Sequence, residues 1–157
     1  MIYEAALDQM VAEIAKSDMG RGEFGRNNRG RDVQYFRDTA GLSTVFGGGE
    51  WCAIWISSVY RRAYYALNMP MAFRPSRGAL RLGKNMAKAG TVLRRPEPVC
   101  VIITKRKGGH HAQLCLDLDF NEAARGLDGN KGKFPAYVSP WHLSFREWER
   151  ARLIVKI

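Results

Sequence analysis

Three consecutive glycines, Gly47 to Gly49, precede a long helical pattern, and this boundary constrains the fold more than any other part of the sequence. The pattern consists of apolar residues that recur with steps of four, three and four positions, namely Cys52, Ile56, Val59 and Ala63. Such residues share one face of a helix, which we expect to begin near Cys52 and to end at about Leu67. The other faces carry polar residues that we expect to be solvated, namely Ser57, Ser58, Arg61 and Arg62.

The pattern places Cys52 in the first helical turn, on the inward face. Free amide N–H groups and the positive end of the helix dipole favour a thiolate there, and a thiolate is the nucleophilic form of cysteine. Free cysteine is also among the most frequently buried residue types. Cys52 is therefore either a nucleophile or a structural core residue, and the other motifs of the chain have to distinguish the two.

Length and composition indicate a small globular protein. The 157 residues suit one domain, and no apolar run approaches the roughly 18–20 residues that span a bilayer. Residues 1–16 lack the layout of a secretory signal, so we expect synthesis in a cytoplasm, with any export depending on another component. Cys52, Cys100 and Cys115 include no C-x-x-C pair, so we expect neither a disulfide framework nor a cysteine-rich zinc site.

The chain is strongly basic, with 25 Lys and Arg against 15 Asp and Glu and a formal net charge of +10. This charge implies attraction to a polyanion, whether a nucleic acid, an anionic membrane or the acidic envelope of a bacterium. The basic residues are spread from Arg21 to Lys156, so the charge alone does not choose among these partners.

Helical patterns fill the first part of the chain. The fourfold spacing of Ala6, Met10 and Ile14 predicts a helix over residues 3–16. Asp32 is placed to cap a second helix that stops at Gly41, and a short helix is expected over residues 74–88.

Strand patterns fill the second part. Residues 99–104 are β-branched and apolar, as in a buried strand, and residues 111–118 alternate as its antiparallel partner. Further strands are expected over residues 126–130, 136–139 and 152–157. Helices followed by strands predict an α+β fold in which N-terminal helices pack on a small antiparallel β-sheet.

A second candidate site lies at the start of the expected hairpin strand, where two glycines precede His110 and His111. A histidine there has a fixed backbone and an open side, which suits a general base for a cysteine nucleophile. Such a base needs a third group to orient its ring, and Asp128 and Asn130 on the next expected strand are of the right type. The alternatives are an exposed turn for the histidines and a plain turn for residues 128–130.

The order of these parts resembles the CHAP family (cysteine, histidine-dependent amidohydrolases/peptidases), which belongs to the papain-like group together with the NlpC-type peptidases. Trp51-Cys52-Ala53 resembles the family's W-C-A block, and Glu23-x-Gly25-x-Asn27 resembles its upstream E-x-G-x-N loop. Residues 98–102, the Gly-His strand from Gly109 and the late Gly129-Asn130 stand where the family has corresponding motifs. The resemblance covers about residues 20–157, although the family's Gly-Asp before its first strand is missing at residues 97–99.

The resemblance implies a papain-like CHAP fold and one catalytic domain over residues 1–157, with an N-terminal helix over 1–20 and no separate wall-binding module. It makes Cys52 the nucleophile and His111 the base, with a one-residue slip to His110 left open. Asn130 is expected to orient the base, with Asp128 as the other candidate.

The same resemblance implies which residues contact the substrate. Trp51, Glu50 and Asn28 are the expected contacts, although core packing for Trp51 and a simple turn for Asn28 are alternatives. No metal or other cofactor is expected.

The family's chemistry implies a cysteine hydrolase that acts on peptidoglycan. It would be either an amidase that cuts between muramic acid and L-alanine or an endopeptidase that cuts within the peptide stem. A small basic chain suits a phage endolysin, a tail lysin or a delivered antibacterial effector. We expect it to be made in a cytoplasm and to act in the periplasm or cell wall, as a monomer that also binds the anionic envelope.

Two other functions remain open. Aromatic and basic residues interleave over residues 60–65, which suits a nucleic-acid-binding face, but no nucleic-acid motif is present and no stable nucleic-acid partner is expected. A zinc site built from His110, His111, His142 and Cys115 lacks the usual ligand spacing.

Overall fold

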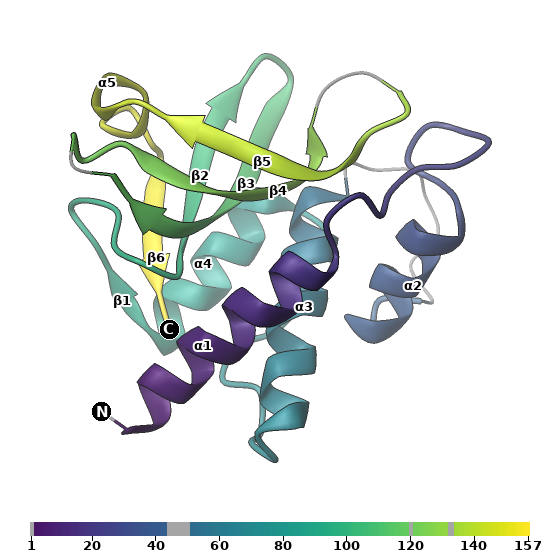
Figure 1. The fold of residues 1–157 in the computed structure, drawn as a ribbon, viewed down its shortest axis with the longest axis horizontal. Coiled ribbons are helices and arrows are strands. Elements are labelled where there is room, and N and C mark those ends of the chain that lie inside the picture. Colours follow the sequence, from purple (N-terminus) through teal and green to yellow (C-terminus); the bar gives the residue numbers. More distant parts are fainter. Residues whose placement is uncertain (1, 44–50, 120, 132–133) are drawn as a thin grey trace.

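The computed structural model describes residues 2–43, 51–119, 121–131 and 134–157. Five helices lie in these ranges, α1 (Ile2–Ser17), α2 (Arg31–Thr39), α3 (Cys52–Ala66), α4 (Ala79–Ala89) and α5 (Phe145–Trp148). The strands are β1 (Thr91–Val92), β2 (Cys100–Arg106), β3 (Gly109–Leu118), β4 (Ala124–Lys131), β5 (Tyr137–Leu143) and β6 (Leu153–Lys156). Figure 1 shows the helices of the first half packed on the strands of the second, which confirms an α+β fold.

The strands form one sheet in the order β1-β6-β2-β3-β4-β5, and every neighbouring pair is antiparallel. The predicted hairpin is present as β2 and β3, with Thr104 opposite His111. The last strand, β6, lies between β1 and β2, so the C-terminal residues form an interior strand next to the edge of the sheet. Helix α5 and strand β1 were not predicted.

Each face of the sheet has its own apolar core. Helices α3 and α4 pack on one face against alternate residues of the hairpin, among them Val101, Ile103 and Leu114. The other face carries a smaller cluster that includes Cys100, Ile102, Cys115 and Trp141. The alternation predicted for β3 is confirmed at Leu114 and Cys115, which belong to different cores. It fails at the end of the strand, because a register shift between Cys115 and Asp117 brings Leu118 to the core of Cys115.

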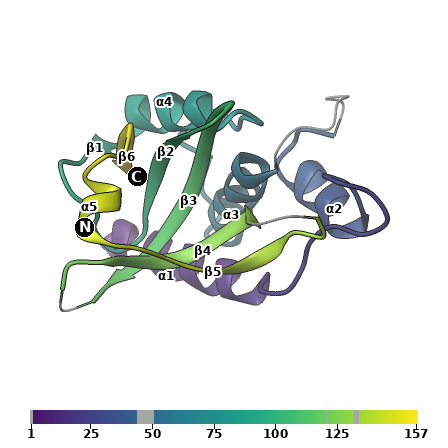
Figure 2. The same ribbon diagram turned by 90° about the horizontal axis from the view of Figure 1, so that it is seen from above.

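Helix α3 is buried on almost every side, between α1, α2 and the sheet (Figure 2). The prediction that Ser57 and Ser58 are solvated is wrong, because both side chains are fully buried. They are tolerated there because each hydroxyl finds a partner: Ser57 bonds the backbone of Ser76, and Ser58 lies 2.6 Å from the Thr39 hydroxyl.

The first helix is confirmed, but its buried face lies one position further along than predicted. Leu7, Val11 and Ala15 are the buried residues, and α1 contacts α3. Helix α4 begins at Ala79 rather than near residue 74, and it lies very close to the sheet at Gly83. A Cβ at Gly83 would lie 2.8 Å from the side chain of Ile103, so glycine permits this close approach.

Candidate active site

The N-terminus of α3 places a thiol beside the first backbone N–H groups of the helix. Cys52 is the first residue of the helix, and the preceding Trp51 makes no side-chain capping hydrogen bond. The first N–H groups of a helix lack partners within the helix, so they are able to stabilise a negative charge at this end. Cys52 is 1% exposed, so attack on a substrate requires the sulfur to become more accessible than it is here.

Two buried carboxylates hold the helix at this end through its tryptophans. The indole N–H of Trp51 donates to Glu23 at 3.1 Å, and the indole N–H of Trp55, one turn later, donates to Asp18 at 3.0 Å. Asp18 also forms an ion pair with Arg62 of the same helix. These contacts fix the rotation and height of the turn that carries Cys52.

Glu23 joins three segments that are distant in sequence. Besides the Trp51 indole, its carboxylate accepts hydrogen bonds from the backbone N–H of Asn28 at 2.7 Å and of Ala136 at 2.9 Å. The side chain is 3% exposed, and three donors compensate the cost of burying its charge. The upstream loop and the start of β5 are thereby held against the N-terminus of α3.

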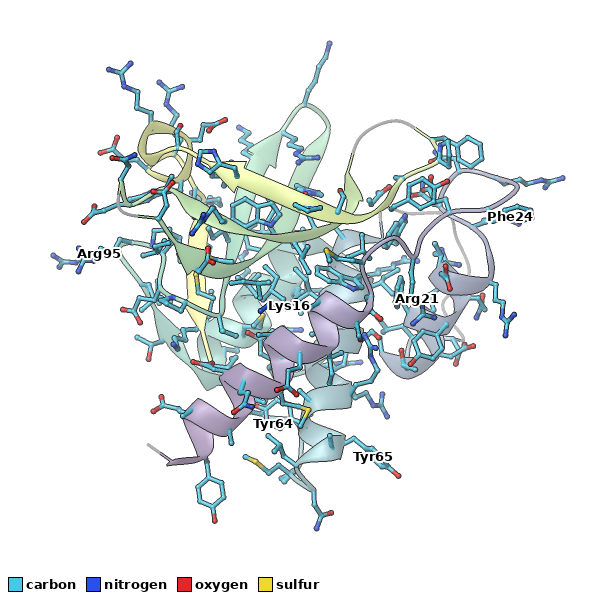
Figure 3. All side chains as sticks on the ribbon, viewed as in Figure 1. Lys16, Arg21, Phe24, Tyr64, Tyr65 and Arg95 are labelled. Atoms are coloured by element: carbon cyan, nitrogen blue, oxygen red, sulfur yellow. The ribbon has the colours of Figure 1, made fainter. Side chains whose placement is uncertain are left out.

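Arg21 extends this framework to the helix α2. Its guanidinium lies 4.2 Å from the centre of the Tyr35 ring and bonds both Asp18 and Asp32. Figure 3 shows Arg21 between the end of α1 and α2, and Phe24 at the outer side of the following loop. Asp18 and Arg21 were not identified from the sequence, because no periodic pattern marks the residues just after a helix.

His111 lies on β3 with its ring next to Asp128 of the neighbouring strand β4. Its Nε2 atom is 2.6 Å from Oδ2 of Asp128, and both side chains are fully buried. The Cys52 thiol also interacts with the ring. The structure therefore brings together Cys52, His111 and Asp128 from three elements.

The second ring nitrogen of His111 is available for the thiol. Nδ1 is buried and makes no hydrogen bond within the described ranges, whereas Nε2 is taken by Asp128, so Nδ1 is the ring nitrogen left for the thiol. Catalytic hydrogen bonds are commonly loose before a substrate binds. The arrangement matches the order nucleophile, base and orienting acid.

The charge state of His111 follows from these neighbours. Burial alone lowers the pKa of the imidazole, but the hydrogen bonds and charges of Asp128 and Cys52 raise the pKa to about 9. The imidazolium form is therefore favoured at neutral pH. A protonated ring is able to pair with a thiolate and to donate a proton to a leaving group.

The structure distinguishes the two histidines and the two orienting candidates. His110 is only partly buried and pairs across the hairpin with Lys105, whereas His111 faces Asp128. Asn130 has a left-handed backbone with φ 65°, and no hydrogen bond joins it to His111 in the part of the chain described. Asp128 therefore takes the position in which the sequence favoured Asn130.

The three residues expected to contact the substrate differ in where the structure places them. Trp51 is fully buried and stacks on Phe36 with ring centres 5.7 Å apart, so it is a core residue and not part of a groove wall. Asn28 forms a turn with φ 56°, and its buried Oδ1 has no hydrogen-bond partner among the described residues. Glu50 lies outside the described residues.

The residues considered for nucleic-acid binding and for a zinc site do not form either site in the described ranges. Tyr60 and Tyr64 are buried, and Arg61 and Arg62 bond Ala40 and Asp18, so only Tyr65 of these tyrosines is exposed, at the lower end of α3 in Figure 3. The stacking face expected over residues 60–65 is therefore not formed. No group of three or more His, Cys, Asp and Glu residues is arranged for a metal ion within the described ranges.

None of the helices in the described ranges has the length and apolar character needed to cross a membrane. No protein-family model matches the chain, and no curated protein matches it in sequence.

Proposed function

We propose that the chain is a cysteine hydrolase of the papain-like CHAP type that cleaves an amide bond of peptidoglycan. The observation that carries the proposal is the meeting of Cys52, His111 and Asp128 at the N-terminus of a helix. A buried thiol, imidazole and carboxylate in this order are the groups that thiol-dependent amide hydrolysis needs. Peptidoglycan as the substrate comes from the resemblance of the sequence motifs and from the net charge of +10.

The reaction begins with a thiolate at Cys52 paired with the imidazolium of His111. The thiolate attacks the amide carbonyl, and the resulting oxyanion is stabilised by the backbone N–H groups at the start of α3. His111 then donates its proton to the leaving amine, which leaves an acyl thioester on Cys52. Water, deprotonated by His111, attacks the thioester, the carboxylic acid product leaves, and Cys52 is released as the thiolate beside the imidazolium.

Asp128 orients the ring during these steps. Its bond to Nε2 leaves Nδ1 for the sulfur and the leaving amine, and its charge favours the imidazolium. Glu23 acts less directly, since it holds Trp51, the residue before the nucleophile. It is a positioning residue.

Digestion of purified sacculi tests the proposal. The wild-type protein is expected to release soluble fragments, and Cys52→Ala is expected to release none above background because the nucleophile is missing. Cys115→Ala is the matched control, since it also removes one buried thiol. Mass spectrometry of the new amino ends separates an amidase from an endopeptidase, and fragment release by Cys52→Ala at the wild-type rate would disprove the hydrolase mechanism.

A further inference from the structure

A basic hollow of about 700 Å³ lies between the segment 72–77 and helix α4. Among the described residues that line it, four are cations, Arg74, Arg77, Arg81 and Lys88, and none is acidic. The mechanism proposed above uses none of them. Because basic residues are elsewhere spread along the chain, this is a local concentration of charge in a concave place.

Two of these cations, Arg81 and Lys88, lie on helix α4, which packs on the sheet. Helix α4 buries Leu82 and Met86 against the sheet, which leaves Arg81, Lys84 and Lys88 exposed on its outer side. A rise of about 1.5 Å per residue spaces Arg81 and Lys88 about 10 Å apart along the helix. Across the described ranges, no carboxylate lies within ion-pair distance of these three cations.

The segment 72–77, which forms the wall of the hollow opposite α4, is also held in place. The side-chain amide of Asn85 donates to the carbonyl of Arg74 at 2.8 Å, which ties this wall to α4. The Ser57 hydroxyl bonds the backbone of Ser76, which ties the same wall to α3. Hydrogen bonds thus hold the segment 72–77 to both α3 and α4.

We propose that this hollow, defined by Arg74, Arg77, Arg81 and Lys88, binds a thin phosphodiester polyanion without bases, of the polyol-phosphate type. Repeated phosphates along a flexible chain match the exposed cations Arg81 and Lys88 on α4 and their basic neighbours, and each contact releases counterions. A single chain fits into a concave site of this size. The choice of a wall polymer as the source rests on the proposed function, but binding at this site does not depend on Cys52.

The lining argues against two other polyanions. Single-stranded nucleic acids bind through exposed aromatic rings as well as charge. Phe73 is the one aromatic residue among the described lining residues, and it is 6% exposed and packs edge-on against Tyr60. A membrane surface is broad and is bound by cations combined with exposed large apolar residues. Among the described residues, the exposed large apolar side chains lie outside this hollow.

The site also lies near the proposed active site. Ser57, which bonds the wall of the hollow, follows Cys52 by five residues, about 7.5 Å along α3. A wall polymer held there would keep the enzyme beside the peptidoglycan to which such polymers are attached.

Binding of poly(glycerol phosphate) tests the inference. The wild-type protein, Arg81→Gln/Lys88→Gln and the control Arg146→Gln/Arg150→Gln are titrated with the polymer at several salt concentrations. Both double variants reduce the net charge from +10 to +8, and Arg146 and Arg150 are exposed residues away from the hollow. We expect the hollow variant to bind at least about fivefold more weakly with a shallower salt dependence, and the control to stay within about twofold.

Equal losses in the two double variants would overturn the inference, because only net charge would then matter. Tighter binding of a single-stranded oligonucleotide of equal charge, or binding only to anionic lipid vesicles, would overturn it as well. All substituted residues are exposed, and equal melting temperatures of the three proteins exclude unfolding as a cause. Polymer binding by a wild-type protein that fails to digest sacculi would support the inference and refute the proposed function, so the two failures are distinguishable.

Discussion

Cys52 and the pair Cys100–Cys115 are all buried free thiols, yet their surroundings differ in kind. Cys100 and Cys115 lie directly opposite each other on β2 and β3, in the smaller core with Trp141. The contact with Cys100, together with burial, raises the pKa of the Cys115 thiol. Cys115 also lies 3.3 Å from the carbonyl oxygen of Asp117, to which it donates.

Cys52 instead lies at a helix N-terminus and interacts with an imidazole whose pKa is raised by the buried carboxylate of Asp128. Burial is therefore the same in the two regions, and the difference lies in the charged partners. The comparison teaches that the position of a cysteine in its secondary structure says more about the reactivity of its thiol than its burial does. Here one thiol lies at the start of a helix and the other two lie within strands.

The largest expected effect is on the rate of fragment release, and it should distinguish the Cys52 region from the Cys100–Cys115 region. His111→Gln removes the base but retains a polar side chain, and we expect fragment release from sacculi to fall by about 1,000-fold or more. Cys115→Ala should keep activity within about twofold and lose on the order of 1 kcal/mol of stability through poorer packing. Release rates and thermal unfolding of both variants give the comparison. A Cys115→Ala protein as inactive as His111→Gln would show that the regions are not functionally different.

A smaller effect should separate Asp128 from Asn130. Asp128→Asn removes the charge that favours the imidazolium, and we expect the rate to fall by about 100-fold with little change in KM, since Asp128 acts through the ring. Asn130→Gly, which suits the left-handed backbone there, should change the rate by no more than about threefold. Steady-state rates on soluble peptidoglycan fragments measure both. The opposite ranking of the two variants would restore Asn130 as the orienting residue.

The smallest expected effect is on how the free energy of unfolding depends on pH. Because the pKa of His111 rises from an ordinary value near 6.5 to about 9 on folding, the folded state holds a proton that the unfolded chain releases between these values. This contribution is complete below about pH 6.5 and is lost as pH rises through 9. Unfolding free energy should therefore fall by up to about 3 kcal/mol over this range in the wild type.

Denaturant titrations of the wild type and His111→Gln at a series of pH values measure that contribution. The variant should lack most of the decline between pH 6.5 and 9. Parallel curves for the two proteins would mean that His111 is not protonated in the folded state.

Much of the fold follows from local patterns. The helix that begins at Cys52 and the hairpin of residues 100–118 are set by spacing and by a glycine turn, and both are present. The buried face of α1 and the burial of Ser57 and Ser58 depend on which neighbours pack there. The insertion of β6 between β1 and β2 is a contact between distant segments, and no local pattern encodes it.

The candidate site was predictable to the level of residue types and order. Helical spacing places Cys52 at a helix start, whereas His111 was preferred to His110 only through the family resemblance, since a one-residue slip turns a strand side chain to the opposite face. Asp128 and Asn130 could not be separated, since both fall on the same face of a regular strand. A register shift between Asp128 and Lys131 breaks that regularity, and only the fold reveals it.

Thiol alkylation tests the central claim most directly. The folded protein is treated with a limiting amount of iodoacetamide at pH 7, and the modified cysteines are identified by mass spectrometry at successive times in the wild type and His111→Gln. The account predicts that Cys52 is modified well before Cys100 and Cys115, and that His111→Gln removes most of this lead. Modification of Cys100 or Cys115 as fast as Cys52, or an unchanged lead in His111→Gln, would contradict it.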